Sequence, residues 1–496
     1  VQANENGGSG ISLDTCVTDG SKCLGSGGIN LATLNNQLNT FDGNHEHGMY
    51  ITSGGIVNLQ YVSASENNES GIFVENPTAY GAITISNPVK TATGDFSYNG
   101  SDGITISTRG DVTLNNLNAS SNSVSGVVID NCQLSGEECI GLGKVTIKNL
   151  YSVINQFNNN HDYGVHILSG GIVSLSNLQA NSNGYNGLYV NNSLETAVVG
   201  VNMSASKGLT NTFNNNGSLL QGTYPGIEVY SYGSISLSSL EANNNLAAGA
   251  YLKNSEGTIS AGAITITDGK FNENQGSGLL AYSRGVVTLN GVTACYNSLV
   301  NSDIVSAGET VHERLTSISS YDTWYFDATE GLHVKIILES TEFDGLLELY
   351  DAGGNLIASN DNGYSETDAL IETDLATAGK YFIHVLAADE NHGNYTISIN
   401  DETHTFQTYF TYYGAMIDNT AGSAVVVINK TANNLWNTFN DNNFSGLEVL
   451  SRNAITITNL TASDNGDAGQ YESAGAYLYN AGGSGGVTLI SSVSGV

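Results

Sequence analysis

Cysteine is the residue of this chain whose type and spacing most clearly predict chemistry. Two pairs of Cys follow an equivalent glycine of a repeated motif by 6 and 13 residues: Cys16 and Cys23 follow Gly10, and Cys132 and Cys139 follow Gly126. Equal offsets in two repeats predict two local disulfides, each closing an outward loop. Because disulfides persist in oxidising compartments, they also predict an extracellular setting. Cys295 is left over, and we expect a buried free thiol, with an intermolecular bridge as the alternative.

Candidates for metal binding or catalysis are weaker. His45-Glu46-His47 places two imidazoles at a predicted turn without a third ligand, so we expect solvated side chains there. Arg109, Arg284 and Arg452 each follow a motif glycine by six residues, which indicates a repeated turn position and not a single catalytic base. The sequence has neither an adjacent Asp pair for acid–base hydrolysis nor a nucleophile-elbow motif in a strand-to-helix context. It therefore predicts no catalytic residue.

Charge and composition exclude several classes of partner. The chain has 496 residues, with 14 Lys+Arg against 47 Asp+Glu and a formal charge of -33. Such a field repels nucleic acid and anionic lipid. No apolar run approaches the roughly 20 residues that span a bilayer, so no transmembrane segment is expected. The excess of Gly (59) over Pro (3) favours tight turns between short strands over helices.

The elements that must position these residues come from an internal repeat. One motif, Gly-apolar-x-apolar followed by a turn, begins at Gly48, Gly103, Gly164, Gly226, Gly278 and Gly446. A second, similar motif begins at Gly10, Gly71, Gly126, Gly187, Gly249, Gly414 and Gly475. In the first four complete pairs, the second motif follows the first after 23 residues, whereas the return distance varies, for example 32 or 38 residues. A constant coil with three short strands predicts a parallel β-solenoid, and the variable leg predicts outward loops.

Two further signatures accompany the glycines. Phe-x-x-Asn precedes the first motif, and Ala-x-x-Asn occupies the other coil. We expect the Phe rings to form an internal stack; they are Phe41, Phe96, Phe157, Phe213, Phe271 and Phe439. We expect the Asn amides to form a hydrogen-bonded ladder, which includes Asn67, Asn122, Asn183 and Asn245. Equivalent positions would lie about 4.8 Å apart along the axis, giving a rod about 60 Å long.

With these motifs, the chain resembles the right-handed parallel β-helix repeat proteins of bacterial secreted and surface type. The resemblance covers residues 1–302 and 405–496 and implies the handedness, which the spacing does not show. The fold class expected is all-β: a parallel β-helix with an inserted antiparallel β-sandwich, jelly-roll-like in form.

Residues 303–404 interrupt the repeat. Gly278 and Gly414 are 136 residues apart where 23 are expected. The additional residues form segments in which apolar and polar residues alternate, and turn signals separate these segments. The segments YDTWYFDATEG, FDGLLELYDAGGNLIASNDNG and AGKYFIHVLAADENHGNYTISI resemble the bacterial pre-peptidase C-terminal domain. Some members of that family bind calcium, and Asp344, Asp351, Asp361 and Asp368 are candidate ligands near predicted turns. The alternative is that these are solvated turn residues.

We therefore expect a non-enzymatic structural protein, extracellular or at the surface of a bacterial cell. It would be a subunit of a filament or a stalk and would contact other copies head to tail. An adhesin-type module that binds a glycan or protein, for example through Tyr224–Tyr232, is the first alternative. A polysaccharide lyase or hydrolase of the β-helix class is the second. Calcium is the one cofactor the sequence suggests.

Overall fold

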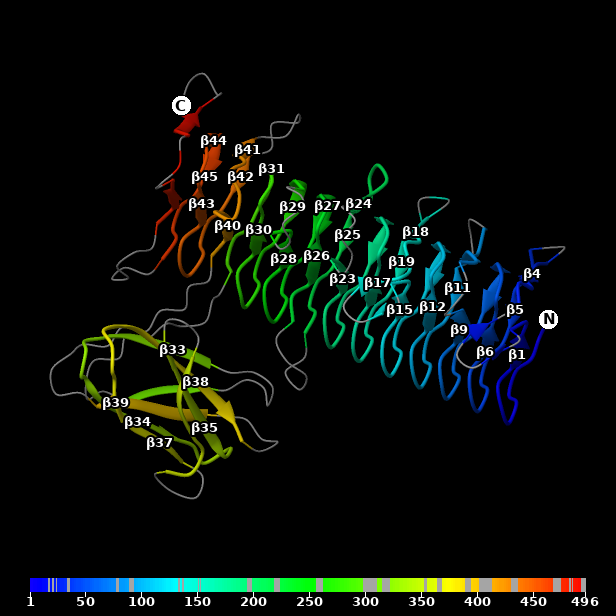
Figure 1. Cartoon of the computed structure of the whole chain (residues 1–496), viewed down its shortest axis with the longest axis horizontal. Coiled ribbons are helices and arrows are strands. Elements are labelled where there is room, and N and C mark those ends of the chain that lie inside the picture. Colours follow the sequence, from blue (N-terminus) through cyan, green and yellow to red (C-terminus); the bar gives the residue numbers. More distant parts are fainter. Residues whose placement is uncertain are drawn as a thin grey trace. The chain divides into compact units, whose positions relative to one another are not determined.

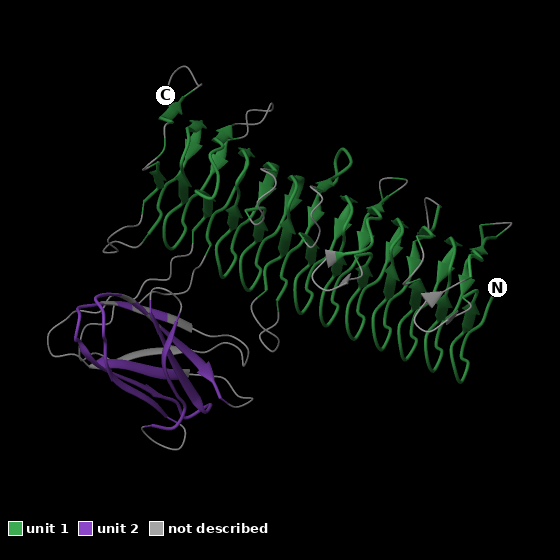
Figure 2. Ribbon diagram, viewed as in Figure 1, with its two compact units in different colours: residues 1–217, 224–298, 413–496 green, residues 218–223, 299–412 purple. Residues whose placement is uncertain are grey.

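The computed structural model contains strands and turns but no helix among its described residues. It describes the chain except residues 17, 20–21, 24, 34–35, 77–79, 89–92, 133, 136–137, 150, 152, 194–198, 218–223, 256–261, 298–309, 315–321, 352–354, 364–367, 389–393, 401–412, 430–435, 467–473, 481–482, 484 and 492–496. The chain divides into two compact units (Figure 2): residues 1–217, 224–298 and 413–496 form unit 1, and residues 218–223 and 299–412 form unit 2. The predicted boundaries at 302/303 and 404/405 lie outside the described residues.

Unit 1 is a parallel β-helix of 13 coils (Figure 1) with three strand-bearing faces. Sheet 1 contains β1 (Ile11–Asp14), β6 (Met49–Thr52), β9 (Ile72–Asn76), β12 (Ile104–Thr108), β15 (Val127–Asp130), β20 (Val165–Leu168), β23 (Leu188–Asn192), β26 (Ile227–Ser231), β28 (Ala250–Lys253), β30 (Leu279–Tyr282), β40 (Ala415–Asn419), β43 (Leu447–Ser451) and β46 (Ala476–Tyr479). Sheet 2 contains β4 (Ile29–Leu31), β7 (Val57–Gln60), β10 (Ile83–Ser86), β13 (Val112–Asn115), β18 (Val145–Lys148), β21 (Val173–Ser176), β24 (Val201–Ser204), β27 (Ile235–Glu241), β29 (Ile264–Lys270), β31 (Val287–Asn290), β41 (Val426–Asn429), β44 (Ile455–Thr458) and β47 (Val487–Ile490).

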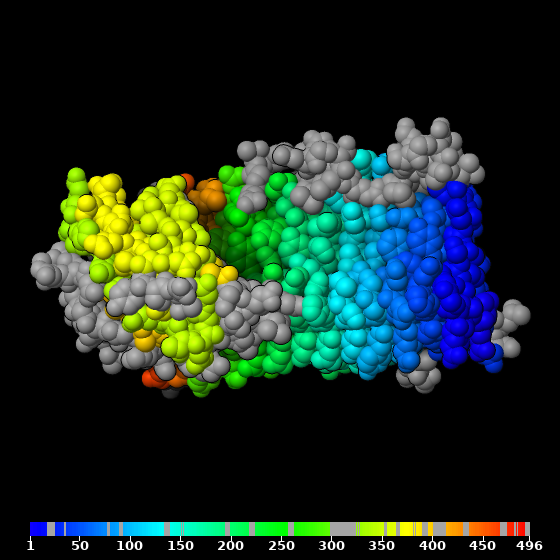
Figure 3. All heavy atoms as spheres, turned by 90° about the horizontal axis from the view of Figure 1, so that it is seen from below, coloured from blue at the N-terminus to red at the C-terminus, as the bar shows by residue number. Residues whose placement is uncertain are grey.

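Sheet 3 is built from shorter strands: β5 (Asn39–Thr40), β8 (Val62–Ser63), β11 (Gly94–Asp95), β14 (Leu117–Asn118), β19 (Asn155–Gln156), β22 (Leu178–Gln179), β25 (Asn211–Thr212), β42 (Asn437–Thr438) and β45 (Leu460–Thr461). The ends of β27 and β29 complete it, because these two strands turn from sheet 2 into sheet 3 at Ser239 and Asp268, which have φ of 52° and 53°. Motif glycines stay aligned from coil to coil, and the coils follow one another as successive bands of colour in Figure 3. The predicted β-helix is confirmed.

The corner between sheets 3 and 1 is held by an unbroken ladder of side-chain amides. The ladder has one Asn in each of the thirteen coils, and each except the last donates from Nδ2 to the Oδ1 of the next at 2.8–3.1 Å. Its members are Asn6, Asn44, Asn67, Asn99, Asn122, Asn160, Asn183, Asn216, Asn245, Asn274, Asn297, Asn442 and Asn465. Each Oδ1 that accepts in this way also accepts from the backbone N–H of the preceding Asn, for example Asn160 to Asn183 at 3.0 Å. Nearly every buried polar atom of the corner is thereby paired.

The ladder stabilises a strained backbone. The residue before each ladder Asn has a positive φ of 53–65°, and only in the second coil, at Gly43, is it a glycine. The left-handed conformation costs about 1–2 kcal/mol for a residue with a Cβ. Residues such as Glu66 and Tyr98 adopt it because the Asn that follows each of them is held by hydrogen bonds to the ladder Asn residues of both adjacent coils.

The motif glycine is required by close packing at the same corner. A Cβ on any of the 13 motif glycines would come within 2.4–2.6 Å of its nearest neighbour, which is a carbonyl oxygen or the Nδ2 of a ladder Asn. On Gly164, for example, it would lie 2.6 Å from the Gly187 oxygen and 2.8 Å from the Cβ of Ala180. The backbone of successive coils therefore approaches too closely for any other residue.

The six Phe side chains are fully buried in one core, but the prediction that their rings form a contacting stack is wrong. The Phe-x-x-Asn and Ala-x-x-Asn signatures occupy the same column, so each Phe has an Ala in the coil above and below; Phe157, for example, lies between Ala119 and Ala180. Successive rings are thus two coils, about 10 Å, apart. The small Ala leaves room for the wide ring of the neighbouring coil, which keeps the interior close-packed.

Unit 2 is an antiparallel β-sandwich, as predicted. One sheet has the order β32 (Thr310–Arg314), β39 (Asn394–Asn400), β34 (His333–Glu339), β37 (Ala369–Asp374); the other has β33 (Asp322–Ala328), β38 (Gly379–Ala387), β35 (Gly345–Asp351), β36 (Leu356–Asn360). Their inner faces form one core that includes Trp324, Ile336, Leu349 and Ile383. Trp324 donates from Nε1 to the Tyr395 hydroxyl at 3.2 Å across the two sheets, so both buried polar groups are paired.

We predict that Asn183→Ala lowers the free energy of unfolding by about 3 kcal/mol. The substitution removes the acceptor of the Asn160 backbone N–H and Nδ2, and it leaves the Asn216 Oδ1 with the backbone N–H of residue 183 as its ladder donor. Asn68→Ala, at an exposed position of the same corner four coils away, should change the free energy of unfolding by less than about 0.5 kcal/mol. Urea unfolding followed by circular dichroism measures both; equal effects would contradict the ladder.

Gly164→Ala should destabilise unit 1 by about 2–4 kcal/mol, because the added methyl group meets backbone atoms that cannot move without breaking sheet 1. Gly7→Ala is the matched control, since a Cβ there has nothing within 4 Å. Thermal melts of the two variants against the parent protein test the prediction, and a Gly164→Ala protein that melts at the parent's temperature would refute it.

Candidate functional site

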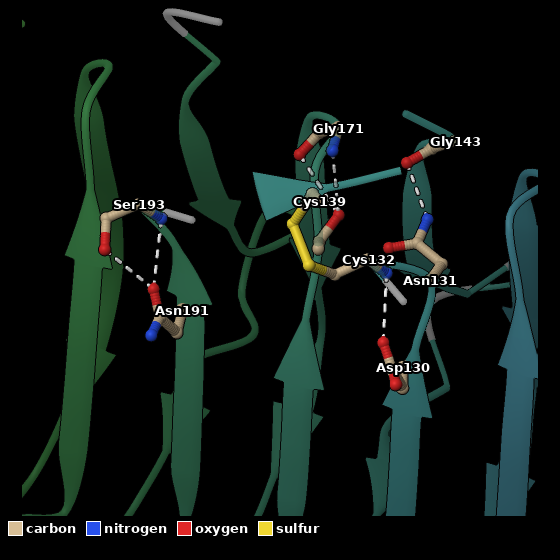
Figure 4. The surroundings of a disulfide bond; sticks show 9 residues. Asp130, Asn131, Cys132, Cys139, Gly143, Gly171, Asn191 and Ser193 are labelled. Carbon is tan, nitrogen blue, oxygen red and sulfur yellow. Dashed lines mark hydrogen bonds between the residues drawn. A yellow bond between two sulfur atoms is a disulfide. The ribbon is translucent and has the colours of Figure 1, made fainter. Parts of the chain in front are cut away.

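Four of the five cysteines lie in loops between sheets 1 and 2; Cys295 lies at the corner between sheets 3 and 1. Cys132 and Cys139 form a disulfide across the hairpin of β16 (Leu134–Ser135) and β17 (Glu138–Cys139), as predicted (Figure 4). Cys16 is also disulfide-bonded. It lies before the hairpin of β2 (Thr18–Asp19) and β3 (Lys22–Cys23), but the side chain of its predicted partner, Cys23, lies outside the described ones.

Both loops begin with the same local turn. The carboxylate of Asp14 accepts the backbone N–H of Cys16 at 2.8 Å, and that of Asp130 accepts the N–H of Cys132 at 3.1 Å. Next to Asp130, the Asn131 Nδ2 donates to the Gly143 oxygen at 2.6 Å and so closes the base of the loop (Figure 4). These contacts are structural.

Cys295 is a buried free thiol, as expected. Its Sγ accepts the Asn440 N–H at 3.3 Å, and burial raises the pKa of the thiol. A raised pKa keeps the less reactive thiol form at neutral pH.

The four Asp candidates for calcium do not come together. Asp351 accepts the backbone N–H of Asn355 at 2.9 Å and closes its own turn, and Asp368 accepts the N–H of Ser340 at 3.0 Å. Asp344 precedes β35, and Asp361 is exposed after β36. In the described part of the chain, no three His, Cys, Asp or Glu side chains are grouped to hold a metal ion. Calcium binding through these four Asp residues therefore stays a prediction.

Neither the arginines nor His45 form a site. Arg109, Arg284 and Arg452 follow strands β12, β30 and β43, the fourth, tenth and twelfth of sheet 1, so no two lie on adjacent coils. Arg284 donates to the Ala421 oxygen at 3.3 Å, which is a structural role. His45 is exposed at its turn.

A continuous group of aromatic side chains, which the sequence analysis identified only in part, covers the outer surface of sheet 1. It consists of Tyr163, His166, Tyr185, Tyr189, Tyr224, Tyr230, Tyr251 and Tyr282, and we call it the aromatic face. Its members follow one another over the five coils from β20 to β30. Neighbouring ring centroids lie 4.4–6.1 Å apart, from Tyr163–His166 at 4.7 Å to Tyr251–Tyr282 at 5.4 Å. Aromatic pairs at such distances stabilise each other and hold the rings in place.

The repeat itself aligns these rings. In sheet 1 the residues two and four positions after the motif glycine point outward, and the parallel register places equivalent positions side by side. His166, Tyr189 and Tyr251 occupy the first outward position, and Tyr230 and Tyr282 the second. Tyr163, Tyr185 and Tyr224 come from the turn just before the glycine. All eight are half-buried, each with part of its ring open to solvent.

Hydrogen-bond acceptors lie among the rings. Glu228, in the first outward position of β26, accepts the Tyr230 hydroxyl at 2.7 Å and the Asn186 Nδ2 at 3.1 Å. That Nδ2 also donates to the Pro225 oxygen at 2.9 Å, which fixes the orientation of the amide. The Oδ1 of Asn186 is buried and has no hydrogen-bond partner in the described structure. A buried acceptor without a donor is costly, so this spot favours a ligand or water that donates.

Burial dominates the electrostatics of the aromatic face. It raises the pKa of Tyr163 from 10.0 to about 12, and nearby phenols and Glu228 act in the same direction. It also raises the pKa of Tyr230, whose hydrogen bond to Glu228 adds to the shift. For His166 burial lowers the pKa, against the opposing charge of Asp130. At neutral pH the rings are therefore uncharged.

A hollow of about 440 Å³ lies on the outer side of sheet 1 in the first coils. Its lining residues are Ser9, Ser12, Glu46, His47, Tyr50 and Glu69. His47 accepts the Ser70 N–H at Nδ1 (3.2 Å), which places its proton on Nε2, 3.2 Å from the Glu69 carboxylate. Its ring also contacts those of Tyr50 and Phe73, with centroids 5.5 and 5.2 Å away.

Comparison with known proteins identifies one family model, which matches part of unit 2. Residues 320–387 match the family model of the bacterial pre-peptidase C-terminal domain. The solved structure of that domain from the collagenase of Bacillus anthracis is 16% identical, covering 20% of this chain and 95% of that one with a TM-score of 0.18. No curated protein matches the sequence.

Two phage tailspikes are among the solved structures that match the chain. Tailspike protein 2 of Escherichia coli O157:H7 bacteriophage CAB120 is 11% identical, with 73% of this chain and 64% of that chain covered and a TM-score of 0.26. The enzymatically active domain of tailspike protein 4 from bacteriophage CBA120 is 10% identical, with 71% and 63% covered and a TM-score of 0.17. The chain thus spans less than two thirds of each tailspike chain. Among the described residues, no helix is long and apolar enough to cross a membrane.

We predict that the protein loses stability between about pH 10 and pH 12, because over this range Tyr163 ionises in the unfolded chain but stays protonated in the folded aromatic face. The folded state holds the Tyr163 proton more tightly than the unfolded chain does, so stability that is complete below pH 10 falls as the pH approaches 12. Tyr163→Phe should reduce this loss, by about 1 kcal/mol at most after solvent screening. The exposed Tyr80→Phe should not. Urea unfolding at pH 9 and pH 11 tests this, and equal losses in both variants would contradict it.

Proposed function

We propose that this protein is a secreted, non-enzymatic structural protein whose β-helix serves as a stiff rod in a cell-surface stalk or extracellular filament. The observation that carries the proposal is the unbroken amide ladder, in which 12 side-chain hydrogen bonds link all 13 coils. Bending the rod would lengthen these side-chain hydrogen bonds together with the backbone hydrogen bonds of all three sheets, so the rod should be stiff.

An extracellular location is part of the proposal. The Cys132–Cys139 disulfide is typical of oxidising compartments. The family matched by residues 320–387 is bacterial. A charge of -33 keeps copies soluble and apart laterally, which leaves contacts between coil ends as the proposed route of assembly into filaments.

Electron microscopy of the native material tests the structural role. We expect stiff, straight particles or fibres of constant width, with an axial repeat related to the 13-coil length of about 60 Å. Flexible or compact particles would contradict the rod, and monodisperse single copies at high concentration would contradict the filament while leaving a stalk.

A second candidate function, an adhesin-type module that binds a glycan or protein, is favoured by the aromatic face. Eight half-buried rings held in one line offer a large, rigid apolar surface with polar edges, a combination common at binding surfaces. It includes Tyr224 and Tyr230 of the segment that the sequence analysis selected for binding.

Polysaccharide cleavage is the activity whose detection would overturn the non-enzymatic proposal. We expect no new reducing ends and no unsaturated products when the protein is incubated with acidic or neutral polysaccharides, with or without calcium. Sustained turnover of any of them, lost in a variant of the responsible residue, would show an enzyme.

A further inference from the structure

We propose that the aromatic face binds a linear glycan that carries free amino groups. The inference rests on the second candidate function above and names its ligand. It follows from the spacing of the rings, from the polar atoms among them and from the charge around them.

The spacing fits a sugar chain. At least one aromatic ring occurs in each of five successive coils, β20, β23, β26, β28 and β30, and coils repeat at about 4.8 Å. One pyranose unit of an extended β-linked glycan advances the chain by nearly the same distance. An extended peptide presents same-side residues about 6.7 Å apart and does not keep pace with the coils.

The rings suit the faces of sugars. Each is half-buried, so one part is fixed by neighbouring rings and the remainder stays open to a ligand. The C–H groups on the face of a pyranose are apolar and pack against such rings, while its hydroxyl and amino groups project from the edge. A row of fixed rings therefore binds several units with little loss of side-chain entropy.

The polar atoms among the rings are acceptors in need of donors. The Glu228 carboxylate accepts from Tyr230 and Asn186, and the buried Asn186 Oδ1 has no donor among the described residues. An ammonium group offers three donors and no acceptor. It can therefore donate to the Glu228 carboxylate, and its charge compensates that of Glu228.

The surrounding charge favours a cationic ligand. Asp130 lies close enough to act on His166, and Asp162 on Tyr185, whereas the five strands contain one basic residue, Lys253, and the neutral His166. Together with the overall charge of -33, this field repels anionic glycans and a second copy of the chain. A glycan with free amines is attracted by the same field.

Calorimetry with the full chain at pH 6 and low salt tests the inference with four probes. These are the β-1,4-linked hexamer of glucosamine, its fully N-acetylated counterpart, the corresponding glucose hexamer and hexalysine. We expect the glucosamine hexamer to bind at least tenfold more tightly than the other three. The acetylated hexamer keeps the shape and loses the charge, and hexalysine keeps the charge and loses the sugar.

Two variants and a control locate the site. Glu228→Gln is nearly isosteric and should remove most of the preference for free amines. Tyr189→Ala, an outward position of sheet 1, should weaken binding of the glucosamine hexamer about tenfold. Tyr80→Ala, an exposed tyrosine outside the aromatic face, should bind like the parent protein. Circular dichroism melts confirm that each variant is folded.

The outcomes separate this inference from the function on which it rests. Equal affinity for the acetylated and free-amine hexamers, lost in Tyr189→Ala, overturns the role of the amine and leaves a glycan-binding face. Equal affinity for hexalysine and the glucosamine hexamer shows attraction by charge alone and overturns the glycan. Binding that Glu228→Gln and Tyr189→Ala leave unchanged, or no binding of any glycan, overturns both the ligand and the place of binding.

Discussion

The alignment of each coil on the next is the constraint on which unit 1 depends, and the corner between sheets 3 and 1 enforces it. There a residue with positive φ, a ladder Asn and a motif glycine follow one another in every coil. The glycine allows the backbones to touch, the Asn pairs the polar groups thus buried, and the strained residue turns the chain. A shift of one residue in any coil would place a side chain where only glycine fits and leave buried amides unpaired.

The aromatic face is a consequence of this alignment. Since every coil repeats the same register, the outward positions of adjacent coils lie side by side, and their rings meet diagonally without any dedicated pocket. Tyr251, for example, is in register with Leu280 but contacts the ring of Tyr282. The interior shows the same principle with a different solution. Phe and Ala alternate in one column, so that each wide ring packs against a small side chain in the coils on either side.

The 23-residue spacing is sufficient to predict the coils and the insertion, and the equal offsets of the cysteines from a motif glycine predict the Cys132–Cys139 disulfide, since each depends on distance along the chain. Features that depend on neighbours in space were missed. The two Asn signatures were assigned to different coils, but their sharing one column, which places Ala between the Phe rings, was not recognised. Positive φ at Glu66 and Tyr98 has no signal in residue type, because the ladder imposes it. Tyr185 and Tyr224 meet at 4.4 Å although they are 39 residues apart in sequence.

The central claim is that ladder Asn residues in adjacent coils act on each other, and a double-mutant cycle measures this directly. The pair Asn160 and Asn183 is bonded at 3.0 Å, whereas Asn67 and Asn183 are four ladder positions apart. Substituting both members of each pair by Ala, we expect a coupling free energy of about 1–2 kcal/mol for the first pair and less than about 0.5 kcal/mol for the second. Additive effects in the first pair, or equal coupling in both, would contradict the ladder and the rod built on it.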